Sequence, residues 1–177
     1  MSWKIFSNAF LLFFSISSLS IAQRISGSST FQILDNIEER IFAIDQLEFY
    51  EDSSNTLDFQ DIIQAGFQDN FRINPDFDKS HFDINHTYWV KLSIENDPNS
   101  TKKWLLEFYD QSIDSLTAFL PTPQGNYQQI NLGDALPFGS REFIHKNFEL
   151  GIANDHAGIS NYYFKIRSSQ KADIRIA

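Results

Sequence analysis

The pattern of hydrophobic and polar positions predicts a series of short β-strands along most of the chain. Hydrophobic and polar residues alternate with a period of two, as side chains do on the two faces of a strand. Turn-forming Asn, Asp, Pro and Gly separate these segments. The clearest segments are Tyr88–Glu95, Lys103–Phe108, Ile113–Leu120, Tyr127–Leu132, Asn147–Ile152 and Asn161–Arg167. Such closely spaced strands, with no helical pattern between them, are typical of an all-β sandwich or jelly roll.

The segments before Tyr88 and after Arg167 are shorter and more varied. Phe31–Leu34 and Gln46–Tyr50 read as further strands, whereas Ile37–Ile44 is compatible with a helical turn or a strand. Thr56–Gly66 reads as a short helix that Gly66 ends. The final residues, Ala172–Ala177, alternate like a strand with nothing after them to pair with, which would leave an exposed edge. We therefore expect the β-sandwich to be truncated at its C-terminal strand.

The first 22 residues have the features of a secretory signal peptide. Lys4 supplies a positive charge, a short apolar run follows, and Ser20-Ile21-Ala22 is a small-x-small cleavage site. A membrane anchor is the alternative, but a spanning helix needs about 20 mostly apolar residues and this run is shorter and rich in serine. We predict a signal peptide over residues 1–22, a lead-in over 23–46 and an exported domain over 47–177.

Composition and motifs exclude several classes of function. The net charge of −9 and the lack of a basic cluster argue against nucleic acid or an anionic membrane surface as a partner. The chain has no cysteine, so its 18 phenylalanines must supply much of the stability through the core. The four histidines lack zinc-site spacing, and no catalytic or phosphate-binding motif occurs. We expect no enzymatic activity, no metal and no cofactor.

The alternation in Tyr88–Glu95 suggests one candidate binding surface. Val90, Leu92 and Ile94 point to one face, and Trp89 and Lys91 to the other. The same reasoning places further aromatic and basic residues outward on later strands: Tyr163, Lys165, Arg167 and Arg175. An aromatic platform beside cations suits a sugar ring, a carboxylate or a phosphate. The alternative is an ordinary solvated face, with Trp89 packed under the connection between Gly133 and Lys146.

Several segments resemble a known family when they are taken together and in order. They are Tyr88–Asn96, Lys103–Glu107, Ile113–Pro121, the connection Gly133–Phe148 with its Pro137, Arg141 and His145, and Tyr163–Ser169. This combination resembles the second type of extracellular domain of bacterial seven-transmembrane receptors with diverse intracellular signalling modules. The likeness runs from Phe49 to Ala177 and implies a carbohydrate-binding-like jelly roll.

The resemblance also implies where a ligand binds. The Pro…Arg…His…Asn segment is distinctive of the family, so Arg141, His145 and Asn147 become candidate ligand contacts beside Trp89 and Lys91. Arg141 would clamp a carboxylate and His145 would donate a hydrogen bond. The alternative is that Arg141 is bound within its own loop. Lys91 stands where the family leads us to expect an arginine, which weakens a bidentate role there.

The function implied is that of a sensor domain. It would lie in the periplasm as part of a bacterial inner-membrane receptor, bind a carbohydrate or another small molecule, and act through membrane helices and an output module, a kinase or a cyclase, downstream of this chain. Two alternatives stay open on sequence grounds: a carbohydrate-targeting module of a secreted hydrolase, and a structural domain that binds another protein or itself.

Overall fold

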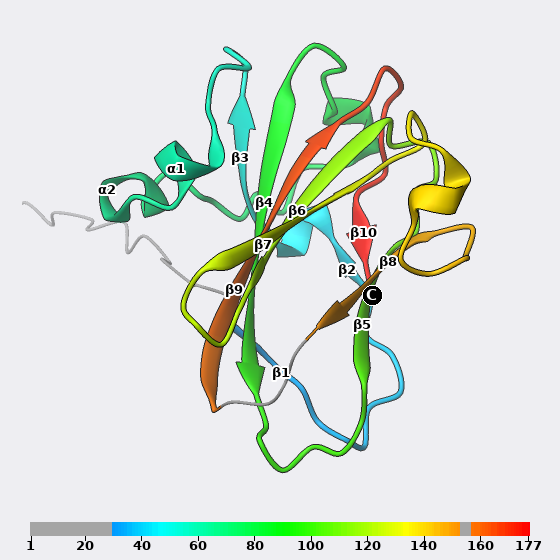
Figure 1. The fold of residues 1–177 in the computed structure, drawn as a ribbon. Coiled ribbons are helices and arrows are strands. Elements are labelled where there is room, and N and C mark those ends of the chain that lie inside the picture. The colour runs from blue at the N-terminus through cyan, green and yellow to red at the C-terminus, as the bar shows by residue number, and fades with distance from the viewer. Residues whose placement is uncertain (1–29, 153–156) are drawn as a thin grey trace, which may run out of the picture.

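The protein folds into two β-sheets that pack face to face, with two short helices beside the larger sheet (Figure 1). We describe a computed structural model, which defines residues 30–152 and 157–177. The predicted signal peptide lies outside the described residues. The β-sandwich expected from the sequence is confirmed.

The larger sheet has six strands. In spatial order they are β1 (Thr30–Gln32), β4 (Thr87–Asn96), β9 (Gly158–Arg167), β6 (Ser115–Pro121) and β7 (Tyr127–Leu132), with β3 (Glu48–Asp52) also paired to β4. β9 pairs along β4 from Tyr88 to Asn96. The opposite edge of β4 is shared by β3 in its first half and by the parallel β1 in its second.

The smaller sheet has four strands, in the order β2 (Phe42–Ala43), β10 (Arg175–Ile176), β5 (Trp104–Phe108) and β8 (Phe148–Ile152). β10 lies between β2 and β5 and pairs antiparallel with both. The prediction that the last strand leaves an exposed edge is therefore wrong. The short β2, which lies in the segment Ile37–Ile44, pairs with that edge. Residues 30–46 thus contribute a strand to each sheet.

The core between the sheets follows directly from the period-two pattern. Val90, Leu92 and Ile94 of β4 are buried, as predicted, beside Phe164 of β9 and Phe108 of β5. The rings of Phe108 and Phe164 lie edge to face with their centroids 4.9 Å apart, so the two sheets meet through these aromatic side chains. Burial of such rings supplies most of the stability that a disulfide-free domain of this size needs.

The outer face of the larger sheet is also covered. Helices α1 (Phe59–Ile62) and α2 (Ala65–Gln68) lie beside it and bury a second hydrophobic cluster. Its buried members are Ile62, Phe71, Trp89, Phe119 and Tyr163. The sequence predicted one helix over Thr56–Gly66 that Gly66 ends; the structure instead has two, and Gly66 lies inside the second. Asp58 caps α1 by accepting from the backbone N–H groups of Gln60 and Asp61, which fixes its start at Phe59.

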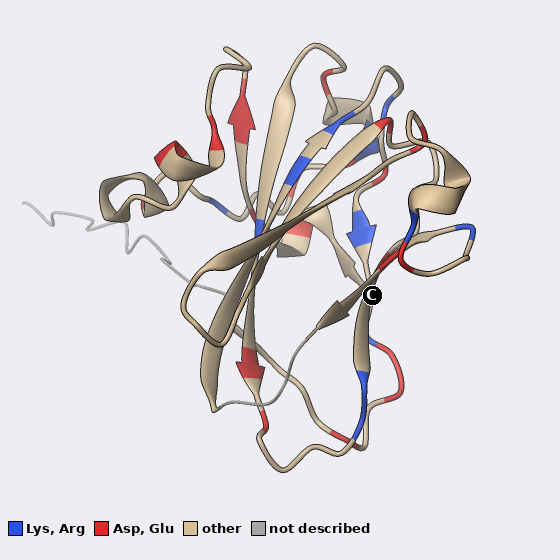
Figure 2. Ribbon diagram, viewed as in Figure 1, with Lys and Arg blue, Asp and Glu red and all other residues tan. Residues whose placement is uncertain are grey.

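Acidic and basic residues lie on different elements around the larger sheet (Figure 2). Figure 2 shows acidic residues on β3 and α1, and basic residues at one end of β9. The described residues also form three 3-10 turns: η1 (Ile44–Gln46), η2 (Lys79–His81) and η3 (Phe138–Ser140). The last of these lies in the connection between β7 and β8, which carries three of the candidate ligand residues.

Candidate functional site

The connection between β7 and β8 is fixed at its start by defined backbone contacts. It begins at Gly133, whose φ of 134° favours glycine. A Cβ atom at Gly133 would lie 2.2 Å from the carbonyl oxygen of Asp114, so another residue would collide with the backbone there. The next N–H groups, of Asp134 and Ala135, donate to the carbonyls of Ile113 and Asp114. The start of the connection is therefore tied to the two residues that precede β6.

Arg141 holds the far end of this connection in place. Its Nη1 donates to the carbonyl oxygens of His145 and Lys146, each at 2.8 Å. Its guanidinium carbon lies 4.6 Å from the ring centroid of Phe138 and 4.7 Å from that of Phe148. Arg141 is thus bound within its own loop, through carbonyls and aromatic rings rather than through a carboxylate. The structure gives it a positioning role, and its contact with a ligand remains a prediction.

His145, which Arg141 positions, faces two carboxylates. Its Nδ1 lies 2.8 Å from Oε1 of Glu149 and 3.6 Å from Oε1 of Glu107. Glu107 on β5 and Glu149 on β8 are directly opposite each other in the antiparallel pair. Asn147 donates from Nδ2 to Oε1 of Glu107 at 2.5 Å and accepts from Nε2 of Gln111 at 3.2 Å. Two acids, one imidazole and one amide therefore converge on the outer face of the smaller sheet.

Trp89 and Lys91 lie elsewhere, on the outer face of the larger sheet. Trp89 is fully buried under the α1 and α2 segment, stacked on Phe119 with ring centroids 5.9 Å apart. Lys91 pairs with Glu48 at 3.4 Å, and both side chains are nearly covered. The prediction of an exposed aromatic platform is therefore wrong. The alternation assigned Trp89 to the correct face, but it does not reveal that hydrophobic residues before Tyr88 cover that face.

The five predicted residues thus separate into two groups. Arg141, His145 and Asn147 come together at the smaller sheet, while Trp89 and Lys91 lie apart from them. The sequence patterns singled out neither Glu107 nor Glu149 as a site residue. Their juxtaposition depends on the register of β5 with β8, which local patterns do not reveal.

A pocket of about 340 Å³ opens beside this cluster. Its walls come from the segment after β1, from β4 and from the smaller sheet. Its apolar lining includes Phe31, Phe42, Leu92, Ile94, Trp104, Leu105 and Leu106; its charged lining includes Glu38, Glu39, Arg40, Lys102, Lys103, Glu107 and Glu149. Arg40 lies over the rings of Phe31 and Phe42, 5.2 and 5.0 Å from their centroids. Glu107 and Glu149 belong to both the pocket and the His145 cluster.

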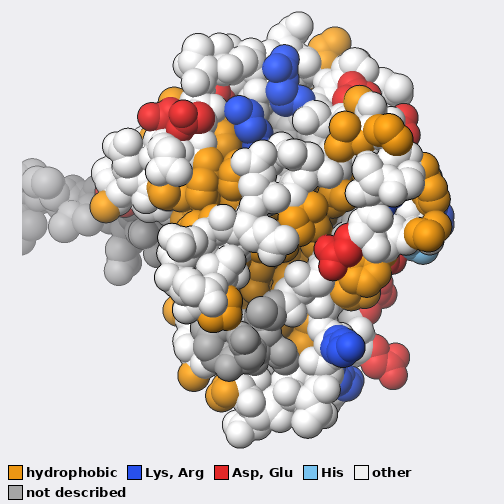
Figure 3. All heavy atoms as spheres, viewed as in Figure 1, with side chains coloured by type: hydrophobic (Ala, Val, Ile, Leu, Met, Phe, Trp, Pro, Cys, Tyr) orange, Lys and Arg blue, Asp and Glu red, His pale blue; other side chains and the backbone are white. Residues whose placement is uncertain are grey.

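The surface of the β7–β8 connection is hydrophobic for an exposed segment. Figure 3 shows hydrophobic side chains gathered on it. Leu136, Phe138 and Ile144 have exposed fractions of 38%, 50% and 86%. Contiguous exposed apolar patches mark interaction surfaces, unlike apolar residues that are scattered singly.

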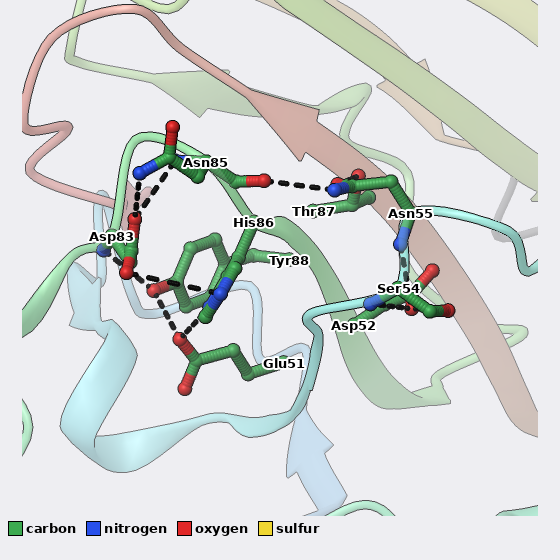
Figure 4. A network of polar contacts seen from close by, with 9 residues as sticks. All are labelled: Glu51, Asp52, Ser54, Asn55, Asp83, Asn85, His86, Thr87 and Tyr88. Atoms are coloured by element: carbon green, nitrogen blue, oxygen red, sulfur yellow. Dashed lines mark hydrogen bonds and ion pairs between the residues drawn. The ribbon is translucent and has the colours of Figure 1, made fainter.

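A second polar cluster joins the turn after β3 to the turn before β4 (Figure 4). Glu51 accepts from Tyr88 at 2.9 Å and contacts Nδ1 of His86 at 2.6 Å, while Nε2 of His86 lies 3.8 Å from Asp83. The hydrogen bond to Glu51 raises the pKa of His86 above its usual range, and Asp83, Glu51 and Asp52 contribute in the same direction.

Asp52 closes the β3 turn of this cluster. Burial alone would raise its pKa, but hydrogen bonds from Ser54, Leu57 and Asn55 outweigh burial and lower it. Asn55, at a positive φ of 57°, links the two turns by donating to the carbonyl of Asn85 and accepting from Thr87. The polar groups of this cluster satisfy one another, which is typical of a structural network.

Comparison with known proteins identifies the family. No curated protein matches the chain. Within the described residues, no helix combines the length and the hydrophobicity needed to cross a membrane. The sequence model of the family described as 7TMR-DISM extracellular 2 matches residues 44–177, most of the chain and nearly the range over which the resemblance was seen. The chain therefore belongs to this family of extracellular domains of seven-transmembrane receptors.

Proposed function

We propose that this domain is the ligand-binding sensor of a membrane signalling receptor and that it binds a small molecule in the pocket between the segment after β1 and the smaller sheet. The observation that carries the proposal is the pocket itself. Its volume of about 340 Å³ falls within the range of small-molecule sites, and its hydrophobic floor with a charged rim has their usual composition. The family membership favours a receptor domain over a module of a secreted hydrolase.

The pocket is placed to affect how the two sheets pack. Leu92 and Ile94 belong to the larger sheet, whereas Leu105 and Leu106 belong to the smaller one. A ligand that contacts all four would favour one arrangement of the sheets over another, and such differential binding is what a signal requires. A sugar is the first class to test, because its ring would stack on Trp104 while its hydroxyl groups bond the charged rim.

The test is a thermal-shift screen of the purified protein against sugars, small anions and amino acids. A ligand at a hundredfold its dissociation constant raises the free energy of unfolding by about 2.7 kcal/mol. The diagnostic variant is Leu105→Lys, because Leu105 is 43% exposed and the change should block the pocket without unfolding the domain. The matched control is Ile159→Lys, which is 60% exposed and does not line the pocket. If no compound shifts the melting temperature, or if Leu105→Lys leaves the shift intact, the pocket is not the sensor site.

A protein-interaction domain is the second candidate. It is favoured by the exposed Leu136, Phe138 and Ile144 on the β7–β8 connection. Light scattering over a concentration series, with Ile144→Ser as the variant, would reveal self-association through this surface. If the protein is monomeric at all concentrations, it does not associate with itself through this surface.

A further inference from the structure

We propose that His145, Glu107 and Glu149 form a binding site for a divalent transition-metal ion such as Zn²⁺. The proposal concerns a separate site at the rim of the pocket, and it holds whether or not the pocket binds a small molecule. Among residues 30–152 and 157–177, these three are the one group of histidine and acidic side chains whose ligand atoms all lie within 4.8 Å of one another.

The spacing of the three ligand atoms fits a metal ion. Zinc binds histidine nitrogen and carboxylate oxygen at about 2.0–2.2 Å, so neighbouring ligand atoms in a tetrahedral site lie about 3.3 Å apart. The Nδ1 atom of His145 lies 2.8 Å from Glu149 and 3.6 Å from Glu107, on either side of that value. Small side-chain rotations would therefore bring all three to coordination distance, with a fourth position left for water or a ligand.

The charges of the group also call for a cation. Glu107 and Glu149 face each other directly across β5 and β8, and like charges in this position destabilise a sheet. Their side chains are only 23% and 17% exposed, so water screens them incompletely. One divalent cation with a neutral imidazole would balance the two carboxylates. In the metal-free arrangement His145 provides, at most, a single positive charge.

The Nδ1 atom of His145 has two neighbours with opposite requirements. If Nδ1 carries a proton, it can donate a hydrogen bond to Glu149. The backbone N–H of Asn147 lies 3.3 Å from the same nitrogen and needs a lone pair there as acceptor. A metal ion would replace that proton and would bind the same lone pair.

The surrounding residues hold the three ligands in position, as residues that hydrogen-bond to the ligands do in metal sites. Arg141 fixes the backbone at His145 through two carbonyl groups. Asn147 orients Glu107 through its Nδ2 and is itself held by Gln111. One imidazole with two carboxylates favours zinc-like ions over calcium or magnesium, which prefer oxygen ligands alone.

The experiment is titration of ZnCl₂ into the chelator-treated protein, purified without a histidine tag and followed by calorimetry. We expect one Zn²⁺ per chain in the wild type. His145→Ala and Glu107→Gln should weaken binding by more than about 100-fold. Asn147→Ala should weaken it by about 10–100-fold, the usual effect of losing a residue that hydrogen-bonds to a metal ligand. The matched control is His86→Ala, which removes a second histidine that contacts two carboxylates, Glu51 and Asp83, and should leave zinc binding unchanged.

A spectroscopic measurement guards against variants that fail to fold. Co²⁺ bound to the wild type should give the visible absorption of a four-coordinate site with nitrogen and oxygen ligands, and added Zn²⁺ should displace it. The proposal is overturned if Zn²⁺ does not bind, if His86→Ala abolishes binding while His145→Ala does not, or if Ca²⁺ competes as strongly as Zn²⁺.

Discussion

The outer faces of the two sheets differ sharply in what covers them. On the larger sheet, Trp89, Phe119 and Tyr163 point outward but are buried by the α1 and α2 segment. On the smaller sheet, Glu107 and Glu149 point outward beneath His145, at the rim of a pocket. The outer face of the larger sheet thus carries a second hydrophobic cluster, whereas the outer face of the smaller sheet carries a group of acidic side chains and an imidazole. Outward direction along a strand therefore does not by itself mark a binding surface.

The largest effect should come from Trp89→Ala. The indole is fully buried, so its removal should lower the free energy of unfolding by about 3–5 kcal/mol. Urea unfolding followed by circular dichroism measures this loss. Trp104→Ala is the control, because Trp104 is only partly buried at the pocket wall and should cost less. A loss for Trp89→Ala no larger than that for Trp104→Ala would show that the covering segment contributes little.

A smaller effect is expected where Lys165 joins the covering segment to the sheet. Its Nζ donates to the carbonyl of Leu57 at 3.0 Å and lies 5.0 Å from the centre of the Trp89 ring. Lys165→Met should cost about 1–2 kcal/mol of unfolding free energy. Arg167→Met, two residues along the same strand but exposed, should change it by less than about 0.5 kcal/mol. Equal effects would mean that Lys165 acts only as a surface charge.

On the smaller sheet, Glu107→Gln should have opposite effects with and without metal. With chelator present, it removes one of two opposed carboxylates while it keeps an acceptor for Asn147, and should stabilise the protein by about 0.2–1 kcal/mol. With saturating Zn²⁺, the variant should be less stable than the wild type, because it has lost a ligand. Thermal melts under both conditions measure the reversal. Destabilisation in chelator would show that the carboxylate pair does not repel.

The smallest effect should be a pH dependence of the stability that His86 contributes, away from the outer faces of both sheets. The pKa of His86 is raised in the folded state, so its contribution to stability is complete below the unfolded value of about 6.5 and is lost as the pH rises through the folded pKa. The stability difference between wild type and His86→Gln should therefore be greatest below about pH 6.5 and should shrink at higher pH. Melting temperatures measured across this range check the sign. A difference that grows with pH would contradict the assignment.

The sequence predicted the strands well but not what surrounds them. β7 has the predicted bounds Tyr127–Leu132, and β4 begins and ends within a residue of its prediction, because strongly alternating segments carry a clear signal. β2 has only two residues, too few for any alternation to be recognised. The pairing of β2 with β10, which removes the expected exposed edge, joins residues far apart in the chain. Local patterns carry no information about such pairing.

The candidate site was predicted only in part, for the same reason. Arg141, His145 and Asn147 were identified through a family resemblance in one continuous segment. Glu107 lies on a different strand, and the direct approach of His145 to it depends on how the β7–β8 connection folds back. The pocket combines residues from five separate stretches of the chain, between Phe31 and Ala177. Its recognition required the three-dimensional arrangement.

The placement of the tryptophans gives the domain two built-in optical reporters. Of the three tryptophans, Trp89 and Trp104 lie in the described residues and Trp3 in the predicted signal peptide, so a protein prepared without residues 1–22 would show tryptophan fluorescence from Trp89 and Trp104 alone. Trp89, shielded from water beneath α1 and α2, should emit at short wavelength until the domain unfolds. Trp104, partly open at the pocket wall, should respond to whatever enters the pocket. A Trp89→Phe protein would therefore report occupancy of the pocket by its emission alone, with no attached dye.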